Sequence, residues 1–271
     1  MPRVAFQGER GAYSEAAASY FFKDVIETIP YPTFYDVLES TEKGNADYSI
    51  LPVENSLEGS VGESYDLLLL TSLNVVGEIY YRIKHCLIGF QSLEKIDTVY
   101  SHPQALGQCR KFIQEHKLKA IPTYDTAGSV KILLELKSNS SACIASKKAA
   151  EIYKVPVIKE GIEDNVNNYT RFLLLAKKRQ GKTTKDKTSI IFSIKHVPGA
   201  LYSILEKFNS NKINLTKIES RPTKNTLWEY NFYVDFEGHE SDYHVQDTLG
   251  KIKENTLFLK VLGSYPRAEL S

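Results

Sequence analysis

The chain has 271 residues and a net charge of +1, with 42% hydrophobic and 25% charged residues. Because domains commonly contain about 100–150 residues, this length fits one large domain or two medium ones. The composition is close to that of average globular proteins, which excludes a disordered, collagen-like or coiled-coil chain. The balanced charge argues against a nucleic-acid-binding protein that relies on broad electrostatic attraction.

Three cysteines, Cys86, Cys109 and Cys143, lie far apart in apolar segments. Their odd number and the lack of CxxC spacing predict buried, reduced thiols rather than a disulfide framework or a metal site. The first residues contain no apolar signal-peptide core. The most apolar local run, Leu67–Leu70, is too short to span a bilayer. We therefore expect a cytoplasmic protein.

The first 176 residues alternate short apolar runs with helical patterns, which predicts an α/β fold. A strand from Val4 leads through the turn GERGAY into a helix from Ser14 to about Phe22. The segment NVVGEIYYRIKHCLIGF predicts one or two long strands that carry the chain into a second lobe, and TRFLLLA predicts a strand that returns to the first sheet. Further strand–loop–helix units are predicted in ADYSILPV and the residues after it, TVYSHPQALGQCRKFIQEH, PTYDTAGSVKILLEL and SACIASKKAAEIY.

A polar, basic stretch at residues 178–187 contains one Gly and no apolar periodicity, which predicts a linker. After it the pattern changes to the order βαββαβ, the ferredoxin-like plan, with Pro198 expected to open the first helix. We therefore expect a catalytic domain at 1–177, the linker at 178–187 and a second domain at 188–271. An antiparallel sheet with both helices on one face leaves its other face or an edge for pairing with another copy.

Five loops of the first domain carry Ser, Thr, Asn, Gln or Gly and lead into predicted helices. They lie around Ser14, 55–60, 101–104, 125–129 and Ser146. Loops at the carboxyl ends of strands build ligand sites in open α/β sheets, and helix N-termini favour anions. Each loop alone is equally compatible with an ordinary helix cap. Together they predict a shared cleft, but they do not identify its ligand.

Several motifs resemble those of the prephenate dehydratase family with a C-terminal ACT domain. They are NYTRFLLLA (168–176), PVENSLEGSV (52–61), YSHPQALGQC (100–109), GAL (199–201) and ESRP (219–222), in the family's order and spacing. The resemblance covers essentially the whole chain. It implies a two-lobed α/β catalytic domain similar to the periplasmic-binding-protein type II fold, followed by a ferredoxin-like ACT domain.

The resemblance also implies an activity: conversion of prephenate to phenylpyruvate, water and carbon dioxide, with feedback inhibition by L-phenylalanine. Loss of carbon dioxide and hydroxide restores an aromatic ring, so this reaction requires no metal, nicotinamide or flavin. The sequence agrees, because it has no GxGxxG, P-loop or His/Cys ligand cluster. We expect no cofactor.

Four catalytic residues follow from the resemblance: Thr170, Asn55, Ser101 and Gln108. Thr170 matches the family's TRF threonine and is the first choice for the group that donates to the leaving 4-hydroxyl. A threonine hydroxyl is a poor free acid, so it acts only as an oriented donor or proton relay in a dry site. Asn and Gln side chains both donate and accept, which suits holding a carboxylate without adding charge.

Other polar residues have two interpretations. Ser56, Ser60, Asp125 and Thr126 are either substrate contacts or helix caps. Arg171 is either a bidentate carboxylate clamp or part of a structural ion pair, because successive strand residues point to opposite faces. His102 is either a conventional acid or, since Pro103 follows it, a loop anchor; we favour the anchor.

In the second domain the resemblance implies an allosteric phenylalanine site. Its expected residues are Gly199, Ala200, Leu201, Glu219, Ser220, Arg221 and Pro222. The first three open a helix whose N–H groups are suited to a carboxylate. ESRP ends a strand and is expected to lie nearby, in the same subunit or in the neighbouring one. We expect a homodimer or homotetramer, with no nucleic-acid or membrane partner.

Two alternatives remain open at this point. Arogenate carries an amino group where prephenate has its side-chain keto group, and the motifs do not distinguish the two substrates. Two α/β lobes with helix N-termini at a cleft also describe solute-binding proteins, so a non-catalytic small-anion-binding regulator is the other alternative.

Overall fold

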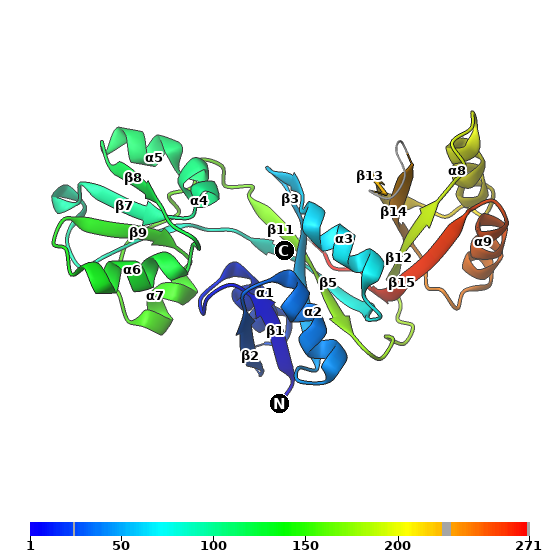
Figure 1. The fold of residues 1–271 in the computed structure, drawn as a ribbon, viewed down its shortest axis with the longest axis horizontal. Coiled ribbons are helices and arrows are strands. Elements are labelled where there is room, and N and C mark those ends of the chain that lie inside the picture. Colours follow the sequence, from blue (N-terminus) through cyan, green and yellow to red (C-terminus); the bar gives the residue numbers. More distant parts are fainter. Residues whose placement is uncertain (24, 224–228, 270–271) are drawn as a thin grey trace. The chain divides into compact units, whose positions relative to one another are not determined.

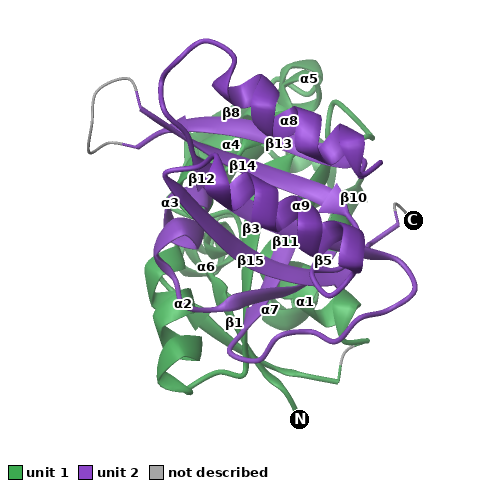
Figure 2. Ribbon diagram, turned by 90° about the vertical axis from the view of Figure 1, so that its right-hand side faces the viewer, with its two compact units in different colours: residues 1–64, 79–172 green, residues 65–78, 173–271 purple. Residues whose placement is uncertain are grey.

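The computed structural model describes residues 1–23, 25–223 and 229–269 (Figure 1). Its contacts divide the chain into two compact units (Figure 2): unit 1 is Met1–Ser64 with Ile79–Phe172, and unit 2 is Tyr65–Glu78 with Leu173–Ser271. Segment 65–78 thus groups with the C-terminal region, although it lies inside the predicted catalytic domain. Unit 1 holds two α/β lobes, and unit 2 holds the small βαββαβ domain, as the sequence predicts.

The first sheet has the strand order β2-β1-β3-β11-β5, with the short β4 paired to β3. β1 runs parallel to both β2 and β3. The strands are β1 (Arg3–Gln7), β2 (Glu27–Tyr31), β3 (Tyr48–Asn55), β4 (Gly59–Ser60), β5 (Asn74–Arg82) and β11 (Tyr169–Ala176). The helices that follow them are α1 (Tyr13–Phe21), α2 (Phe34–Lys43) and α3 (Gly62–Leu70). Strand β11 returns to this sheet after the second lobe, which confirms the expectation from TRFLLLA.

The second sheet has the order β10-β6-β9-β7-β8, in which β7 is parallel to β8 and β9. Its strands are β6 (Cys86–Ile88), β7 (Thr98–Ser101), β8 (Lys119–Pro122), β9 (Ser141–Ala145) and β10 (Val157–Glu160). Its helices are the 3-10 turn η1 (Leu93–Lys95), α4 (Pro103–Gln108), α5 (Arg110–Glu115), α6 (Gly128–Leu136) and α7 (Lys147–Tyr153). All three cysteines are free and buried in the core of this lobe.

Two elements of the first lobe carry weak sequence signals. β2 is an edge strand whose Glu27 and Pro30 are exposed, so it lacks a buried apolar run. α2 has the end signals of a helix: Thr33 accepts from the Asp36 N–H, and Gly44 takes a left-handed φ of 84° after the last turn. Its apolar residues are few, and the caps carry more information than the hydrophobic pattern.

The small domain in unit 2 has the element order β12–α8–β13–β14–α9–β15, which confirms the predicted βαββαβ plan. The elements are β12 (Asp186–Ser193), α8 (Ala200–Ser210), β13 (Leu215–Pro222), β14 (Tyr230–Glu237), α9 (Tyr243–Glu254) and β15 (Phe258–Pro266). The antiparallel sheet has the order β13-β14-β12-β15. Pro198 does not open α8, contrary to expectation. Gly199, with φ 81°, is the N-cap, because its left-handed conformation turns the chain into the helix.

One face of this sheet packs against α8 and α9 through Ile190, Phe192, Ile204, Phe208 and Val245. Segment 65–78 covers its other face, where Tyr233 Oη donates to the Tyr65 carbonyl at 3.0 Å. A Cβ built on Gly263 would lie 2.3 Å from the Val75 carbonyl oxygen, so only glycine permits this approach of strands. The sheet face expected to be free for another copy is therefore covered within the chain, and the alternative expectation, an edge of the sheet, concerns β13 or β15.

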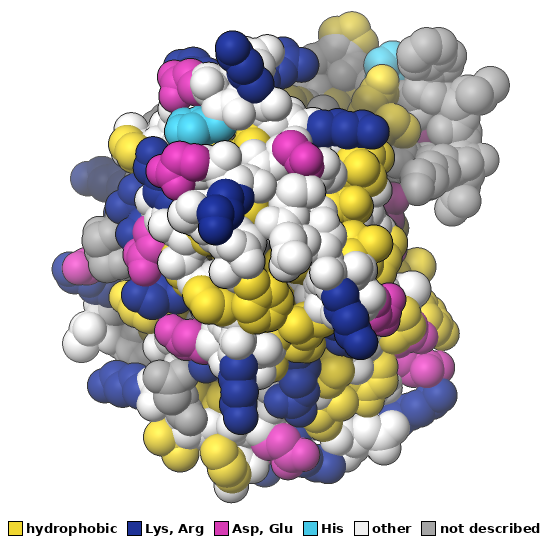
Figure 3. All heavy atoms as spheres, turned by 90° about the vertical axis from the view of Figure 1, so that its left-hand side faces the viewer, with side chains coloured by type: hydrophobic (Ala, Val, Ile, Leu, Met, Phe, Trp, Pro, Cys, Tyr) yellow, Lys and Arg dark blue, Asp and Glu magenta, His cyan; other side chains and the backbone are white. Residues whose placement is uncertain are grey.

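In the part of the chain that the structure describes, no helix is long and apolar enough to cross a membrane. Figure 3 shows one face of the molecule, on which basic and acidic side chains are interspersed rather than separated by sign. Such a mixture produces no single-sign field for a polyanion.

Candidate active site

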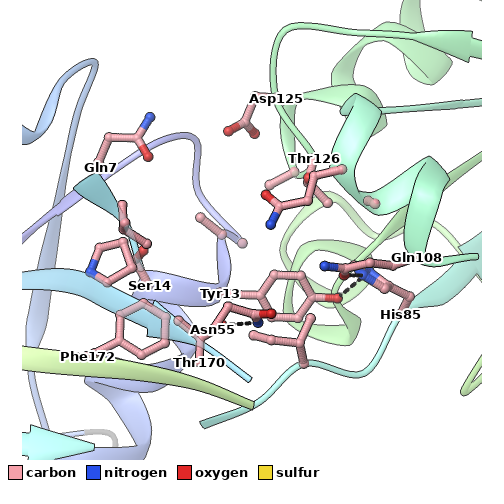
Figure 4. Close-up of a pocket in the computed structure, with 18 of the residues that line it drawn as sticks. Gln7, Tyr13, Ser14, Asn55, His85, Gln108, Asp125, Thr126, Thr170 and Phe172 are labelled. Atoms are coloured by element: carbon pink, nitrogen blue, oxygen red, sulfur yellow. Dashed lines mark hydrogen bonds between the residues drawn. The ribbon is translucent and has the colours of Figure 1, made fainter. Parts of the chain in front are cut away.

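A cavity of about 260 Å³ lies in unit 1 and is lined by residues of both lobes (Figure 4). Four of the five predicted loops contribute to it; the loop at Ser146 does not. Its lining is Gln7, Gly11, Ala12, Tyr13, Ser14, Phe34, Pro52, Asn55, Val61, Ile83, His85, Gln104, Ala105, Gln108, Asp125, Thr126, Ala127, Thr170 and Phe172. This size is near the lower end of the range for small-molecule sites.

Asn55 is the best-anchored polar side chain of the cavity. It ends β3, and its Oδ1 accepts from the backbone N–H groups of Leu57 at 2.9 Å and Glu58 at 3.0 Å. The amide oxygen is thereby identified, so Nδ2 is the end that donates. Nδ2 lies 2.8 Å from Asn168 Oδ1 and 3.0 Å from Thr170 Oγ1.

The Thr170 hydroxyl is oriented by this contact. Its oxygen accepts from Asn55, and its side chain, only 8% exposed, faces the cavity from β11. Among the described residues, none accepts the hydroxyl proton. Thr170 can therefore donate that proton to a molecule in the cavity.

Further hydrogen bonds extend from Asn168 into the second lobe. Asn168 Nδ2 donates to Gln108 Oε1 at 2.9 Å, and His85 Nε2 lies 2.9 Å from the same oxygen. His85 Nδ1 in turn lies 2.8 Å from Tyr13 Oη (Figure 4). Burial lowers the pKa of His85 and raises the pKa of Tyr13 well above its usual value, so both side chains favour their neutral forms.

The electrostatic character of the cavity comes from dipoles rather than cations. No Lys or Arg is among the described residues that line it. Helix α1 has no side-chain cap, and its first residues, Tyr13 and Ser14, line the cavity. Uncapped N–H groups at a helix N-terminus bind anions. Asp125 is the carboxylate of the cavity, and burial raises its pKa.

A second cavity, of about 300 Å³, lies in unit 2 at the N-terminus of α8. Gly199, Ala200 and Leu201 line it, together with Tyr230 and Phe232 of β14. The ESRP residues lie on β13 and are not among its lining residues. Arg221 pairs with Asp66 of α3 at 3.3 Å, and Glu219 pairs with Lys217 at 3.2 Å.

Comparison with known proteins identifies the family. The prephenate dehydratase profile matches residues 4–180, and the ACT domain profile matches residues 188–254. The bifunctional chorismate mutase/prephenate dehydratase of Aquifex aeolicus is 41% identical over 271 residues, which cover 99% of this chain and 74% of that protein. This chain belongs to the prephenate dehydratase family.

Other similar proteins include an arogenate dehydratase and two proteins of known structure. Arogenate dehydratase/prephenate dehydratase 2 of Arabidopsis thaliana is 41% identical over 277 residues, covering 97% of this chain and 72% of that protein. The structure of Arthrobacter aurescens prephenate dehydratase in complex with L-Phe aligns with a TM-score of 0.90 at 32% identity, covering 98% of this chain and 90% of that one. GqqA, described as a quorum-quenching acylase, aligns with a TM-score of 0.90 at 30% identity and covers 98% of both chains. The protein is thus a dehydratase of the lyase class with a C-terminal ACT domain.

Within this family frame, Asn55, Gln108, Asp125, Thr126 and Thr170 all line the one cavity, although they come from distant parts of the sequence. The amide of Asn55 and the hydroxyl of Thr170 are in direct contact.

Other predicted site residues lie outside the cavity lining. Ser101 is fully buried and donates to the Ile144 carbonyl at 2.7 Å, which joins β7 to β9. Ser56 donates to the Asn167 carbonyl at 2.7 Å, and Ser60 is exposed on β4. His102 caps α4, accepting from the Gln104 N–H at 3.3 Å, in agreement with the favoured loop-anchor interpretation.

Arg171 is also outside the cavity lining and is only 4% exposed. Its neighbours in β11, Thr170 and Phe172, both line the cavity. This is the alternation expected of a strand, and it favours the structural interpretation of Arg171.

Tyr13, His85, Asn168 and Phe172 are cavity or network residues that the sequence did not indicate. Strand alternation could have indicated Phe172, because it lies two residues after Thr170 on the same face of the strand. Asn168 could have been noticed as the first residue of the NYTRF motif. For Tyr13 and His85 no sequence signal was available, because the two residues whose side chains meet lie 72 positions apart in the chain.

Proposed function

We propose that this enzyme converts prephenate to phenylpyruvate, water and carbon dioxide, with Thr170 as the donor to the departing hydroxyl. The ring carboxylate leaves as carbon dioxide, and its electron pair enters the ring. The ring C–O bond breaks with its pair on oxygen, which takes a proton and leaves as water. Overall one proton is consumed from solution.

The observation that carries this proposal is the contact between Asn55 Nδ2 and Thr170 Oγ1 at 3.0 Å. It occupies a lone pair of the hydroxyl oxygen and leaves the proton for the substrate. General-acid assistance of this kind contributes roughly 10²–10⁴ in rate. Asn55 and Gln108 hold the substrate by neutral hydrogen bonds, and Ser101 supports β7 behind them. The ring carboxylate stays ionised and able to release its electrons.

The substrate carboxylates need partners, and the uncapped N-terminus of α1 is suited to one of them. Ser56, Ser60 and Thr126 belong to loops at the cavity or next to it, and we assign them supporting roles in shaping it. Arg171 lies on the face of β11 that points away from the cavity, and we assign it a structural role.

Arogenate is the second candidate substrate, and one observation favours it. Asp125 lines the cavity, and a carboxylate there is a suitable partner for the ammonium group of arogenate. The ratio of kcat/KM on the two substrates decides between them. If arogenate is preferred, Asp125→Asn should reduce that preference, because the variant removes the charge and keeps the shape.

We further propose that L-phenylalanine inhibits the enzyme at the second cavity, which Gly199, Ala200 and Leu201 line. Glu219, Ser220, Arg221 and Pro222 of a neighbouring subunit would complete the site in a homodimer or homotetramer. The proposed domains are 1–177 and 188–271, joined by the linker 178–187, in a cytoplasmic enzyme.

Two other functions, an acylase and a non-catalytic anion-binding regulator, have less support. An acylase acting through Thr170 needs a base beside its hydroxyl, yet His85 is engaged at both ring nitrogens by Tyr13 and Gln108. A non-catalytic anion-binding regulator would not need a hydroxyl oriented by Asn55.

The test is an assay of phenylpyruvate formation from prephenate, with and without millimolar L-phenylalanine. We expect turnover that L-phenylalanine inhibits, and a loss of kcat of about a hundredfold or more in Thr170→Ala with the fold retained. Near-normal turnover of Thr170→Ala would remove this residue from the chemistry. Binding of prephenate by the wild-type chain without phenylpyruvate formation would support the regulator.

A further inference from the structure

We propose that His85 is a positioning residue: its Nε2–H fixes the Gln108 amide so that the NH₂ group of Gln108 is left to donate to the substrate. The inference rests on the proposed function, because Gln108 is one of its substrate-holding residues. His85 itself reaches the reaction only through Gln108.

The direction of every hydrogen bond in this network follows from its backbone anchor. Asn55 Oδ1 accepts from two backbone N–H groups, so Asn55 Nδ2 must donate to Asn168 Oδ1. Asn168 Nδ2 must then donate to Gln108, so the Gln108 atom at that contact is the acceptor Oε1. The orientation of three amide side chains is therefore fixed in sequence from the main chain of β3 and its loop.

The same logic fixes the tautomer of His85. Since Gln108 Oε1 only accepts, His85 Nε2 must carry a hydrogen to make the 2.9 Å contact. In a neutral imidazole Nδ1 is then the acceptor, and the Tyr13 hydroxyl, 2.8 Å from Nδ1 and 3.0 Å from the Lys84 carbonyl oxygen, shares its one hydrogen between these two acceptors. The Tyr13 and His85 rings meet edge to face with centroids 5.4 Å apart, which adds a steric restraint.

Burial keeps the imidazole neutral. His85 is only 2% exposed, and desolvation lowers its pKa. The charged groups near it are Glu163, whose Oε2 accepts from the His85 backbone N–H at 2.9 Å, and Arg82, which lies 3.6 Å from the other oxygen of that carboxylate. Gln108 and Tyr13 face the ring without charge.

The consequence concerns which end of the Gln108 amide meets the substrate. With Oε1 held by both Asn168 and His85, Nε2 is the donating end, and its long contact to Glu58 Oε1, at 3.5 Å, leaves it able to donate to a substrate. If His85 is removed, one donor holds the oxygen instead of two, and the amide can rotate. A rotated amide presents oxygen to an anionic substrate, which repels it.

The first test measures the tautomer directly. In the folded wild-type chain with ¹⁵N-labelled histidine, NMR at neutral pH should show that Nε2 of His85 carries the ring proton and that Nδ1 carries none. A hydrogen on Nδ1 would overturn the proposed arrangement. This readout does not depend on turnover, so it stays informative if the chain forms no phenylpyruvate, an outcome that would contradict the proposed function instead.

The second test is a double-mutant cycle of His85→Phe and Gln108→Ala, with prephenate as substrate. His85→Phe alone should lower kcat about tenfold, the order expected for the loss of one oriented hydrogen bond. In the Gln108→Ala background the same substitution should change kcat less than about twofold. An equal loss in both backgrounds would show that His85 does not act through Gln108.

Two further variants separate positioning from general structural damage. His85→Gln retains a side-chain N–H donor and should recover part of the kcat lost in His85→Phe, and it serves the cycle if His85→Phe does not fold. His116→Phe alters the histidine that follows α5 as its C-cap, beside the Phe112 carbonyl and ring and outside the cavity lining, and kcat should not change. A similar loss of kcat in His116→Phe would contradict a specific role for His85.

Discussion

Two regions of the molecule use different kinds of polar contact. One is the cavity of unit 1, and the other is the face of the ACT sheet that meets segment 65–78 in unit 2. In the cavity, Asn55 and Gln108 are linked through neutral amides. On the ACT face two lysines make charged contacts. Lys187 pairs with Glu78 at 2.9 Å with side chains 6% and 0% exposed, and Lys260 Nζ lies 2.6–3.1 Å from the carbonyls of Leu68, Leu69 and Thr71.

The difference reflects what each region has to accomplish. Neutral amides orient a hydroxyl proton through fixed donor and acceptor ends, and they add no charge that would hold the reacting carboxylate too tightly. Buried charges give little net stability when paired, yet separation of the pair is expensive, so they fix one arrangement of two elements. The cavity therefore depends on hydrogen-bond direction, and the ACT face depends on charge pairing.

Breaking the buried ion pair should have the largest effect on stability. Glu78→Gln removes the carboxylate that pairs with the buried Lys187 ammonium, and we expect a loss of about 3–5 kcal/mol in the free energy of unfolding. Urea denaturation measures it. The control is Glu160→Gln, which removes an exposed carboxylate paired with Lys84 and Lys147 and should change stability little. Equal stability of Glu78→Gln and wild type would contradict the charge-pairing account.

Loosening the ACT face at Lys260 should weaken regulation rather than catalysis. Lys260 holds the carboxyl end of α3, the helix that begins at Gly62, directly after the loop of Asn55. In Lys260→Met we expect the L-phenylalanine concentration for half-inhibition to rise by about fivefold or more, with kcat unchanged. Calorimetry should show that L-phenylalanine still binds.

The matched control for this prediction is Lys251→Met, which removes an exposed lysine of α9 that pairs with Asp247. Its inhibition curve should overlay that of the wild type. An unchanged curve for Lys260→Met as well would mean that α3 does not transmit the signal.

Arg171→Lys should have a smaller effect, on stability only. Arg171 is buried and outside the cavity lining. Lysine loses the planar guanidinium fork, so we expect a loss of about 1–2 kcal/mol in unfolding free energy. KM for prephenate should stay within about twofold of the wild-type value. A large rise in KM with intact stability would instead make Arg171 a carboxylate clamp.

The smallest expected effect is on the pH dependence of stability. The pKa of His85 is lowered in the folded chain, so below its ordinary value of about 6.5 the unfolded chain binds more protons. Stability should therefore fall as pH falls through this range, and His85→Phe should lack that part of the decline. Parallel melting curves of wild type and variant against pH would contradict a neutral, buried His85.

Local pattern predicted the two α/β lobes and the βαββαβ order, and the resemblance to the family implied that Asn55 and Thr170 belong to one site. The sequence pattern did not predict edge strand β2, because the exposed Glu27 and Pro30 interrupt any apolar run. Ser101 shows the limit for site residues: its position before a helix suggested a substrate contact, whereas its hydroxyl donates to Ile144 in the neighbouring strand. Sequence position does not reveal which of several acceptors a short hydroxyl will reach.

Tyr13 and His85 show a second limit. Their contact joins residues 72 positions apart and depends on the packing of two lobes, which no local pattern encodes. The direction of the amide network likewise depends on two backbone N–H groups after β3. These features become visible only when donors and acceptors are assigned in three dimensions.

The most direct test of hydrogen-bond direction is the kcat of Asn55→Asp at saturating prephenate. The aspartate oxygen at Oδ1 can still accept from Leu57 and Glu58, but its second oxygen would take the Thr170 proton instead of donating to that hydroxyl. We predict that kcat of the folded variant falls about a hundredfold or more, whereas electrostatic repulsion alone would mainly raise KM. A kcat within about threefold of the wild-type value would contradict the account.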